Sequence, residues 1–137
     1  MGAIEIYRSR FKPSAYLKEP YLMLAYNAIV ADTEAESAFL ASSSQQSFIN
    51  LQQGRPGKLP KPVENFAEQM NASSKLYLNH MMTCSAIGVK ETVREKVKAF
   101  IDSTQPDELM FTGNVYDIDK RLHSFSLIAD VMNELNG

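Results

Sequence analysis

The sequence predicts a helix-rich α/β protein that contains two buried strands of the parallel type. Two almost continuously apolar runs lie at about residues 21–30 and 108–114. Runs of this kind are typical of strands that are covered on both faces, as in a parallel sheet. A helix start follows each run directly, at Thr33 and at Asp117, and a strand that leads into a helix is half of a βαβ unit. Residues 1–137 have the length of a single domain.

The elements before the central loop can be assigned in order. Residues 1–12 carry apolar side chains at helical spacing and predict the tail of a helix, which a proline-bracketed linker follows. A proline boundary and aromatic residues favour a strand over a buried helix for the first apolar run. Thr33 and Glu36 have the spacing of a capping box, so a helix is expected from here to about Gln53. The expected apolar stripe of this helix is Ala35, Ala38, Phe39, Ser42, Gln46 and Ile49.

A loop at residues 54–62, which holds three of the six prolines, ends that helix. Residues 63–71 and 73–82 predict two short helical pieces. Gly88 precedes an amphipathic helix, and a final helix begins after the second strand with Asp117 as its N-cap. The expected buried stripes of these two helices are Val89, Val93, Val97, Phe100 and Ile101 in the first, and Ile118, Leu122, Phe125, Ala129 and Met132 in the second.

Charge and composition argue against several classes of protein. The 14 basic and 16 acidic side chains give a net charge of −2, which provides no electrostatic footprint for nucleic acid or an anionic membrane. No run of 18 apolar residues predicts a membrane span, and the N-terminus lacks the layout of a signal peptide. Cys84 is the one cysteine and cannot form an internal disulfide. We therefore expect a cytoplasmic protein with neither nucleic acid nor a membrane as a partner.

The sequence contains no self-sufficient catalytic motif and no cluster of histidine and cysteine with metal-ligand spacing. His80 and His123 lie in expected helices without a partner motif, so we expect them to be surface or structural residues. Cys84 follows a methionine pair and is expected to pack as a small apolar side chain rather than act as a nucleophile. No catalytic and no metal-binding residue is therefore assigned.

The first candidate site lies at the end of the second strand. Ligands of parallel α/β proteins bind at the carboxyl ends of the strands. Thr112, Gly113 and Asn114 place a hydroxyl, a bare backbone and an amide at one such end, with Tyr116 close behind. We expect these four residues to lie near a cofactor or substrate. The alternative is that Gly113 and Asn114 only form the turn into the helix.

The second candidate site is the proline-rich loop, which has three basic side chains. Arg55, Pro56, Gly57 and Lys58 form its first part, and long irregular loops are often lids over active sites. An ordinary solvated connector is the alternative interpretation of this segment.

Six motifs follow one another along the chain. They are Tyr7-Arg8-x-x-Phe11-x-Pro13-Ser14, the strand from Pro20 into Ala31-Asp32-Thr33-x-x-Glu36, Gly54-Arg55-Pro56-Gly57-x-Leu59-Pro60-x-Pro62, Ile87-Gly88-x-x-Glu91-x-Val93, Glu108-Leu109-Met110 and Tyr116-Asp117-x-x-x-Arg121-Leu122-x-Ser124-Phe125. Their order and spacing hold along essentially all 137 residues. The sequence resembles one subgroup of the luciferase-like flavin monooxygenases, the bacterial luciferase or alkanal monooxygenase family.

This resemblance implies a fragment of a TIM barrel. The chain is similar only to the C-terminal portion of the family, and a complete barrel needs about 250 residues. The family binds reduced FMN, adds molecular oxygen to it, and oxidises a small organic substrate such as an aldehyde. Its catalytic histidine and most FMN phosphate contacts belong to earlier strands that have no counterpart here. The resemblance therefore implies that this chain alone is inactive and does not bind FMN.

Two segments can be matched to functional regions of the family. The segment from Leu51 to about Ser74 is similar to the region of the mobile active-site loop, and residues 112–116 are similar to the end of the last strand, near the flavin site. One departure occurs at Val89-Lys90, where the family usually has Ser/Thr-Pro, and it weakens the expected helix start.

The expected strands also predict a partner. Two apolar strands taken from a closed barrel would expose sheet edges and a wide apolar face if nothing covered them. We therefore expect a homodimer, or a complementary chain that carries the N-terminal barrel strands. The alternative to a monooxygenase fragment is a non-catalytic half-barrel that acts as a dimer in an interaction or structural role.

Overall fold

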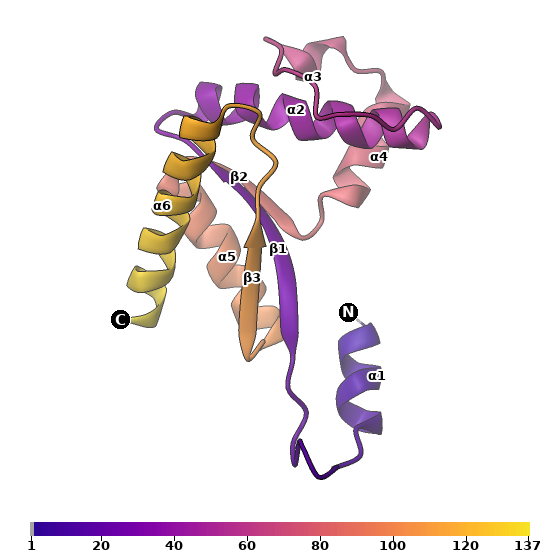
Figure 1. Ribbon diagram of the computed structural model, residues 1–137, viewed down its shortest axis with the longest axis vertical. Helices are drawn as coiled ribbons and strands as arrows, with labels where there is room; N and C mark the ends of the chain where they lie inside the picture. The colour runs from indigo at the N-terminus through magenta and orange to yellow at the C-terminus, as the bar shows by residue number, and fades with distance from the viewer. Residues whose placement is uncertain (1) are drawn as a thin grey trace.

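Helices surround a three-stranded parallel sheet in a computed structural model that describes residues 2–137 (Figure 1). Along the chain the elements are α1 (Gly2–Arg10), β1 (Met23–Val30), α2 (Glu34–Gln52), α3 (Phe66–Gln69), α4 (Ala72–Met81), β2 (Ser85–Gly88), α5 (Lys90–Thr104), β3 (Glu108–Thr112) and α6 (Ile118–Asn136). The expected α/β class, with helices in the majority and parallel strands, is confirmed.

The strands lie in the order β2-β1-β3, so β1 is central. Its carboxyl half pairs with β2, where Asn27 lies opposite Ser85, and its amino half pairs with β3, where Met23 lies opposite Glu108. The two expected strands are present as β1 and β3, but the sequence analysis did not predict β2, the third strand. Strand β2 was missed because it has only four residues and ends on Gly88, which as a sequence signal indicates the start of the next helix.

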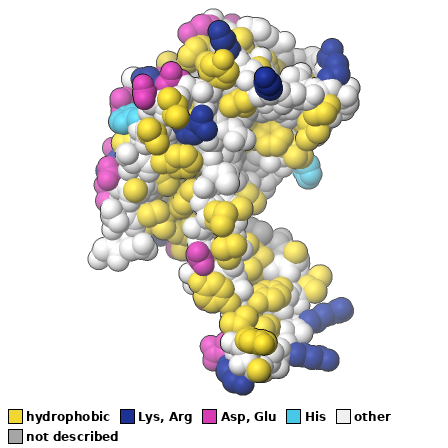
Figure 2. Space-filling model, in the orientation of Figure 1, with side chains coloured by type: hydrophobic (Ala, Val, Ile, Leu, Met, Phe, Trp, Pro, Cys, Tyr) yellow, Lys and Arg dark blue, Asp and Glu magenta, His cyan; other side chains and the backbone are white. Residues whose placement is uncertain are grey.

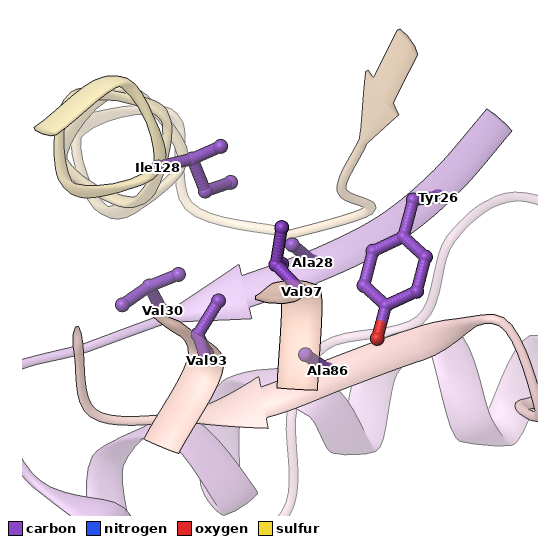
Figure 3. Packing of buried hydrophobic residues seen from close by; sticks show 7 residues of the cluster. All are labelled: Tyr26, Ala28, Val30, Ala86, Val93, Val97 and Ile128. Atoms are coloured by element: carbon purple, nitrogen blue, oxygen red, sulfur yellow. The ribbon is translucent and has the colours of Figure 1, made fainter. Parts of the chain in front are cut away.

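One face of the sheet packs against α5 and α6 to form the main core (Figure 3). The cluster consists of Tyr26, Ala28, Val30, Ala86, Val93, Val97 and Ile128. Val93 and Val97 are fully buried, as their place in the expected stripe of α5 predicted. Burial of a side chain of this size contributes about 1.5–3 kcal/mol. This layer holds β1 and the two helices as one unit.

Helix α2 lies across the carboxyl ends of the strands, at the top of Figure 1. A second cluster joins it to the sheet and to the chain after β3, and it consists of Ile29, Ala31, Leu40, Ala41 and Val115. The expected stripe of α2 is wrong in part, because Ala35 and Ala38 are exposed whereas Leu40 and Ala41 are buried. Since α2 touches β1, β2 and α4, it is covered on more than one side, and a single stripe does not describe it.

The buried side of α6 also differs from the expected one. Ile118 and Leu122 are 63% and 60% exposed, while Ser124, Ile128 and Val131 are buried. The Ser124 hydroxyl accepts a hydrogen bond from the backbone N–H of Val30 at 2.9 Å. This bond satisfies a buried donor at the end of β1 and fixes the rotation of α6 about its axis.

Strands β1 and β3, which were both expected to be buried, are not buried along their whole length. In β3 the side chains alternate between exposed and half-buried, and Met110 is 49% exposed. Met23, at the start of β1, is 50% exposed. These residues lie on the face opposite α5 and α6, beyond the reach of α2. The amino half of the sheet is therefore open on one face.

Helix α1 forms a lower lobe that is joined to the rest by a narrow waist (Figure 2). No residue of α1 is buried, and hydrophobic side chains gather on the surface of the lobe. The Tyr7 hydroxyl donates to the backbone carbonyl of Tyr21 at 3.1 Å, and Arg8 Nη2 donates to the carbonyl of Thr104 at 3.0 Å. A few hydrogen bonds therefore hold α1 against the amino end of the sheet.

Candidate functional site

The carboxyl edge of the sheet is the candidate site, because three chain segments emerge there. Residues 31–33 follow β1, Val89 follows β2, and residues 113–117 follow β3. Helices α2, α5 and α6 all begin at this edge. In parallel α/β architectures this is the edge at which ligands bind.

Two acidic side chains, one in the turn after β1 and one in the first turn of α2, pair with residues of α6. Asp32 Oδ1 lies 2.9 Å from His123 Nε2, and Glu36 forms an ion pair with Lys120, both on α6. The hydrogen bond to Glu36 raises the pKa of the Lys120 ammonium. His123 is 44% exposed in its side chain, as expected for a surface histidine. These contacts fix the start of α6 beside the end of β1.

Glu34 supplies the cap that α5 lacks. Val89 is the N-cap residue of α5 and has no side chain that can accept a hydrogen bond. The Glu34 carboxylate acts here like the glutamate of a capping box, since its Oε1 accepts hydrogen bonds from the Val89 N–H at 3.4 Å and from the Thr92 hydroxyl at 2.7 Å. A carboxylate is also favoured at the positive end of a helix dipole. The departure from Ser/Thr at position 89 is therefore compensated in part from α2.

Gly88 makes this contact sterically feasible. Its φ is +157°, and an added Cβ would lie 2.8 Å from Thr92 Cγ2 and 3.1 Å from Glu34 Oε2. Only glycine leaves room for the carboxylate and the threonine to meet above the end of β2.

Replacement of Glu34 by alanine is expected to destabilise the protein by about 1 kcal/mol, the typical cost of losing a helix cap. Addition of Val89→Ser to that variant is expected to recover most of the loss, because serine can cap the helix itself. Urea unfolding of both variants and of Glu64→Ala, which removes an exposed carboxylate elsewhere, checks this. Equal stabilities of Glu34→Ala and Glu64→Ala would contradict the capping role.

The residues expected at the end of the second strand do lie at this edge. Thr112 and Asn114 are exposed, and Tyr116 is 43% exposed. Gly113 is pressed against β1, since an added Cβ would lie 2.7 Å from the Ala28 carbonyl oxygen. The close approach to β1 explains a glycine at position 113, while a role in binding for Thr112, Asn114 and Tyr116 stays a prediction. The neighbouring Val115 is fully buried and anchors the segment.

The loop residues lie apart from that segment. Arg55, Pro56, Gly57 and Lys58 are all exposed and follow the far end of α2, whereas the residues after β3 lie near its beginning (Figure 1). A helix of 19 residues spans about 28 Å. The structure therefore does not bring the two predicted sites together.

The chain that returns from the loop is attached to α2. The Ser42 hydroxyl accepts a hydrogen bond from the Val63 N–H at 2.8 Å, and Gln46 Nε2 donates to the Lys61 carbonyl at 2.9 Å. Sequence reasoning placed Ser42 and Gln46 on the apolar stripe of α2 and missed this function. Two polar residues on that stripe were the available signal, since a buried polar side chain needs a hydrogen-bond partner.

A flavin would need an enclosed binding site. Four of the cavities in residues 2–137 have volumes of about 400–460 Å³, and none of these four is lined by a residue of either predicted site. The nearby charged side chains Glu36 and Lys120 are already paired with each other. Residues 112–116 therefore offer one wall for a cofactor and do not fit a flavin by themselves. Among residues 2–137, no group of three or more metal-ligating side chains lies close enough to hold a metal ion, and no helix is long and apolar enough to cross a membrane.

The fold defines a parallel α/β protein with an open three-stranded sheet and exposed polar side chains at the carboxyl ends of its strands. No protein-family model matches the sequence. A luciferase-like monooxygenase of Escherichia coli K12 is 39% identical over 135 residues, which are 98% of this chain and 40% of that protein. The uncharacterized protein YvbT of Bacillus subtilis is 36% identical over 129 residues, which are 94% of this chain and 38% of that protein.

The crystal structure of apo-MsnO8 has the same fold over 96% of this chain and 41% of its own length, with a TM-score of 0.74 and 20% sequence identity. The chain is therefore a partial luciferase-like region. It spans about 40% of the length of the curated relatives described above.

Proposed function

We propose that this chain is part of a flavin-dependent monooxygenase and is inactive without the rest of the barrel. The observation that carries the proposal is that 98% of this chain, which folds around an open parallel sheet, is 39% identical to a region that makes up 40% of a luciferase-like monooxygenase. Reduced FMN, which reacts with molecular oxygen, would supply the oxidising chemistry in the completed protein. The substrate would be a small organic molecule such as an aldehyde.

In this proposal the chain contributes one side of the barrel and part of its ligand-binding rim. Thr112, Asn114 and Tyr116 present a hydroxyl, an amide and a phenol to solvent at the carboxyl edge. Gly113 holds this segment close to β1, and Val115 anchors it in the second cluster. These contacts place the three polar side chains on a fixed backbone, as a binding rim requires.

The open face of the sheet supports the need for a further polypeptide. Met23 and Met110 are each about half exposed on the side that would be the barrel interior. An apolar sheet face without a cover is unfavourable in water and marks an interaction surface. The missing strands of a barrel would cover it.

A reconstitution experiment tests the proposal. The chain is mixed with a polypeptide that carries the part of the E. coli luciferase-like monooxygenase it does not match, and FMN binding and aldehyde-dependent oxygen consumption are measured. Both are expected in the mixture and in neither component alone. Asn114→Ala is expected to weaken FMN binding or turnover in the mixture, whereas Asn133→Ala, on the outer side of α6, is expected to leave both unchanged. Micromolar FMN binding by the chain alone would contradict its proposed inactivity.

A non-catalytic half-barrel that acts as an oligomer is the second candidate function. The observation that favours it is the opposite charge at the two open edges of the sheet, where Lys96 lines a cavity beside β2 and Glu108 lines one beside β3. Stable self-association without any response to FMN or to the complementary polypeptide would support this candidate.

A further inference from the structure

Strand β2 is an edge strand, and a groove runs along its outer side, where no further strand of residues 2–137 pairs with it. Asn27 donates its N–H to the Cys84 carbonyl at 3.1 Å, and Ala31 donates to the Gly88 carbonyl at 3.2 Å. Because backbone groups alternate in direction along a strand, those of Ser85 and Ile87 point away from β1. Three of the four cavities lie along this edge, and each is lined by Ser85, Ile87 or both. Helices α4 and α5 provide walls of this groove.

Strand β3 is the other edge strand, and a second groove runs along its outer side. Glu108 donates its N–H to the Leu22 carbonyl at 3.2 Å, so the backbone groups of Leu109 and Phe111 point away from β1. The fourth cavity, of about 400 Å³, lies along this edge and is lined by both residues together with Met132 of α6. Each open edge of the sheet therefore combines free backbone groups with an apolar hollow.

The groove beside β3 is acidic, whereas the part of the β2 groove between α4 and α5 is basic. Lys75 and Lys96 line the groove beside β2, and neither forms an ion pair with another residue in the range 2–137. The acidic residues of that groove, Glu64 and Glu68, line only the cavity next to α3. The groove beside β3 is lined by Asp107 and Glu108 and by no basic residue.

The charges also lie at matching levels. Lys96 shares a cavity with Thr83 and Ser85, at the amino end of β2, and Glu108 is the first residue of β3. Two parallel strands run in the same direction, and a register with level amino ends is one of those open to them. In that register, a β3 edge that pairs in parallel with a β2 edge would bring Glu108 close to Lys96.

A dimer whose two-fold axis passes through one edge does not use this complementarity. Such an axis pairs that edge with its own copy, so it would place Glu108 near a second Glu108, or Lys96 near a second Lys96. Like charges across an interface are unfavourable. A head-to-tail arrangement joins unlike edges and avoids this repulsion.

We propose that the chain associates head to tail with further copies of itself, with the β3 edge of one copy in parallel with the β2 edge of the next. The two apolar hollows then cover each other, and Asp107 and Glu108 face Lys75 and Lys96. A contact of this kind forms a closed ring when its rotation closes, and the strands of the copies then form one continuous parallel sheet. The proposal concerns the same edges as the proposed function but does not depend on flavin chemistry.

A charge-exchange experiment tests this arrangement by light scattering and sedimentation at low ionic strength. The wild-type chain is expected to associate. Lys96→Glu and Glu108→Lys are each expected to weaken association about tenfold or more, which corresponds to about 1.4 kcal/mol or more. An equimolar mixture of the two variants is expected to associate again, because each acidic edge then meets a basic one. Lys58→Glu, at an exposed loop residue that lines none of the four cavities, is the matched control and is expected to associate as the wild type does.

The other outcomes are decisive. Glu108 Oε2 lies 3.0 Å from the Tyr21 hydroxyl, so Glu108→Gln is a second variant that removes the charge and keeps an acceptor for that hydrogen bond. A wild-type chain that stays monomeric would overturn the proposal, even if it reconstitutes activity with the complementary polypeptide. Association that persists in both charge variants, or a mixture that stays monomeric, would overturn it too. Circular dichroism establishes that each variant is folded.

Discussion

Alanine in place of Gly113 is expected to destabilise the protein by about 1–3 kcal/mol, the usual cost of forcing extra atoms into a packed region. The added Cβ would lie 2.7 Å from the Ala28 carbonyl oxygen, which is closer than real side chains approach. The atom that would have to move belongs to the backbone of β1, the central strand. The strain is therefore expected to spread into the sheet. Urea unfolding measures the loss.

Gly57→Ala is the matched control for this substitution. Gly57 lies in the proline-rich loop, and an added Cβ there would meet nothing within 4 Å. The two variants make the same chemical change, so a difference between their unfolding free energies reports the close approach of Gly113 to β1. Equal stabilities would show that this segment does not pack on β1 as described.

The parts of the fold that were predictable have strong local signals. Strands β1 and β3 were found because each is an apolar run that leads directly into a helix cap. The caps are formed as expected, since Thr33 Oγ1 accepts a hydrogen bond from the Glu36 N–H at 3.1 Å and Asp117 accepts one from the Lys120 N–H at 3.0 Å. The capping box is only half formed, because the Glu36 side chain pairs with Lys120 instead.

The parts that were missed depend on contacts between distant segments. Strand β2 has a four-residue sequence without its own signal and exists because β1 lies beside it. The buried side of α6 was misassigned because a serine, Ser124, faces the sheet and bonds to Val30. Hydrophobic periodicity cannot identify a polar residue that is buried by its hydrogen bond.

The same reason limits what could be predicted about the site. The location of residues 112–116 at the carboxyl edge follows from the parallel order of the strands, whereas their role in binding stays a prediction. The contact of Glu34 with the start of α5 joins α2 to Val89 and Thr92, which lie 55 and 58 positions further along the chain. The only trace of it in the sequence is the absence of a capping residue at Val89.

Alanine in place of Ile29 is expected to destabilise the protein by about 2–5 kcal/mol, the range found when a large buried aliphatic side chain is truncated. Ile29 is fully buried in the second cluster, between the carboxyl end of β1 and helix α2. Ile6→Ala is the control, since Ile6 lies on α1 and is 57% exposed. Its expected effect is within about 0.5 kcal/mol, as for most surface substitutions.

The position of Ile29 gives this prediction a second, local outcome. Ile29, Ala31 and Val115 attach α2 to the sheet at the candidate site, while Tyr26, Val93 and Val97 hold the other layer separately. Loss of Ile29 is therefore expected to speed amide hydrogen exchange in α2 more than in α5, because regions with fewer buried contacts open more readily. Uniform acceleration in both helices would show that the two clusters unfold as one unit. In that case the carboxyl edge would have the full stability of the core, and α2 could not move over the site independently of the sheet.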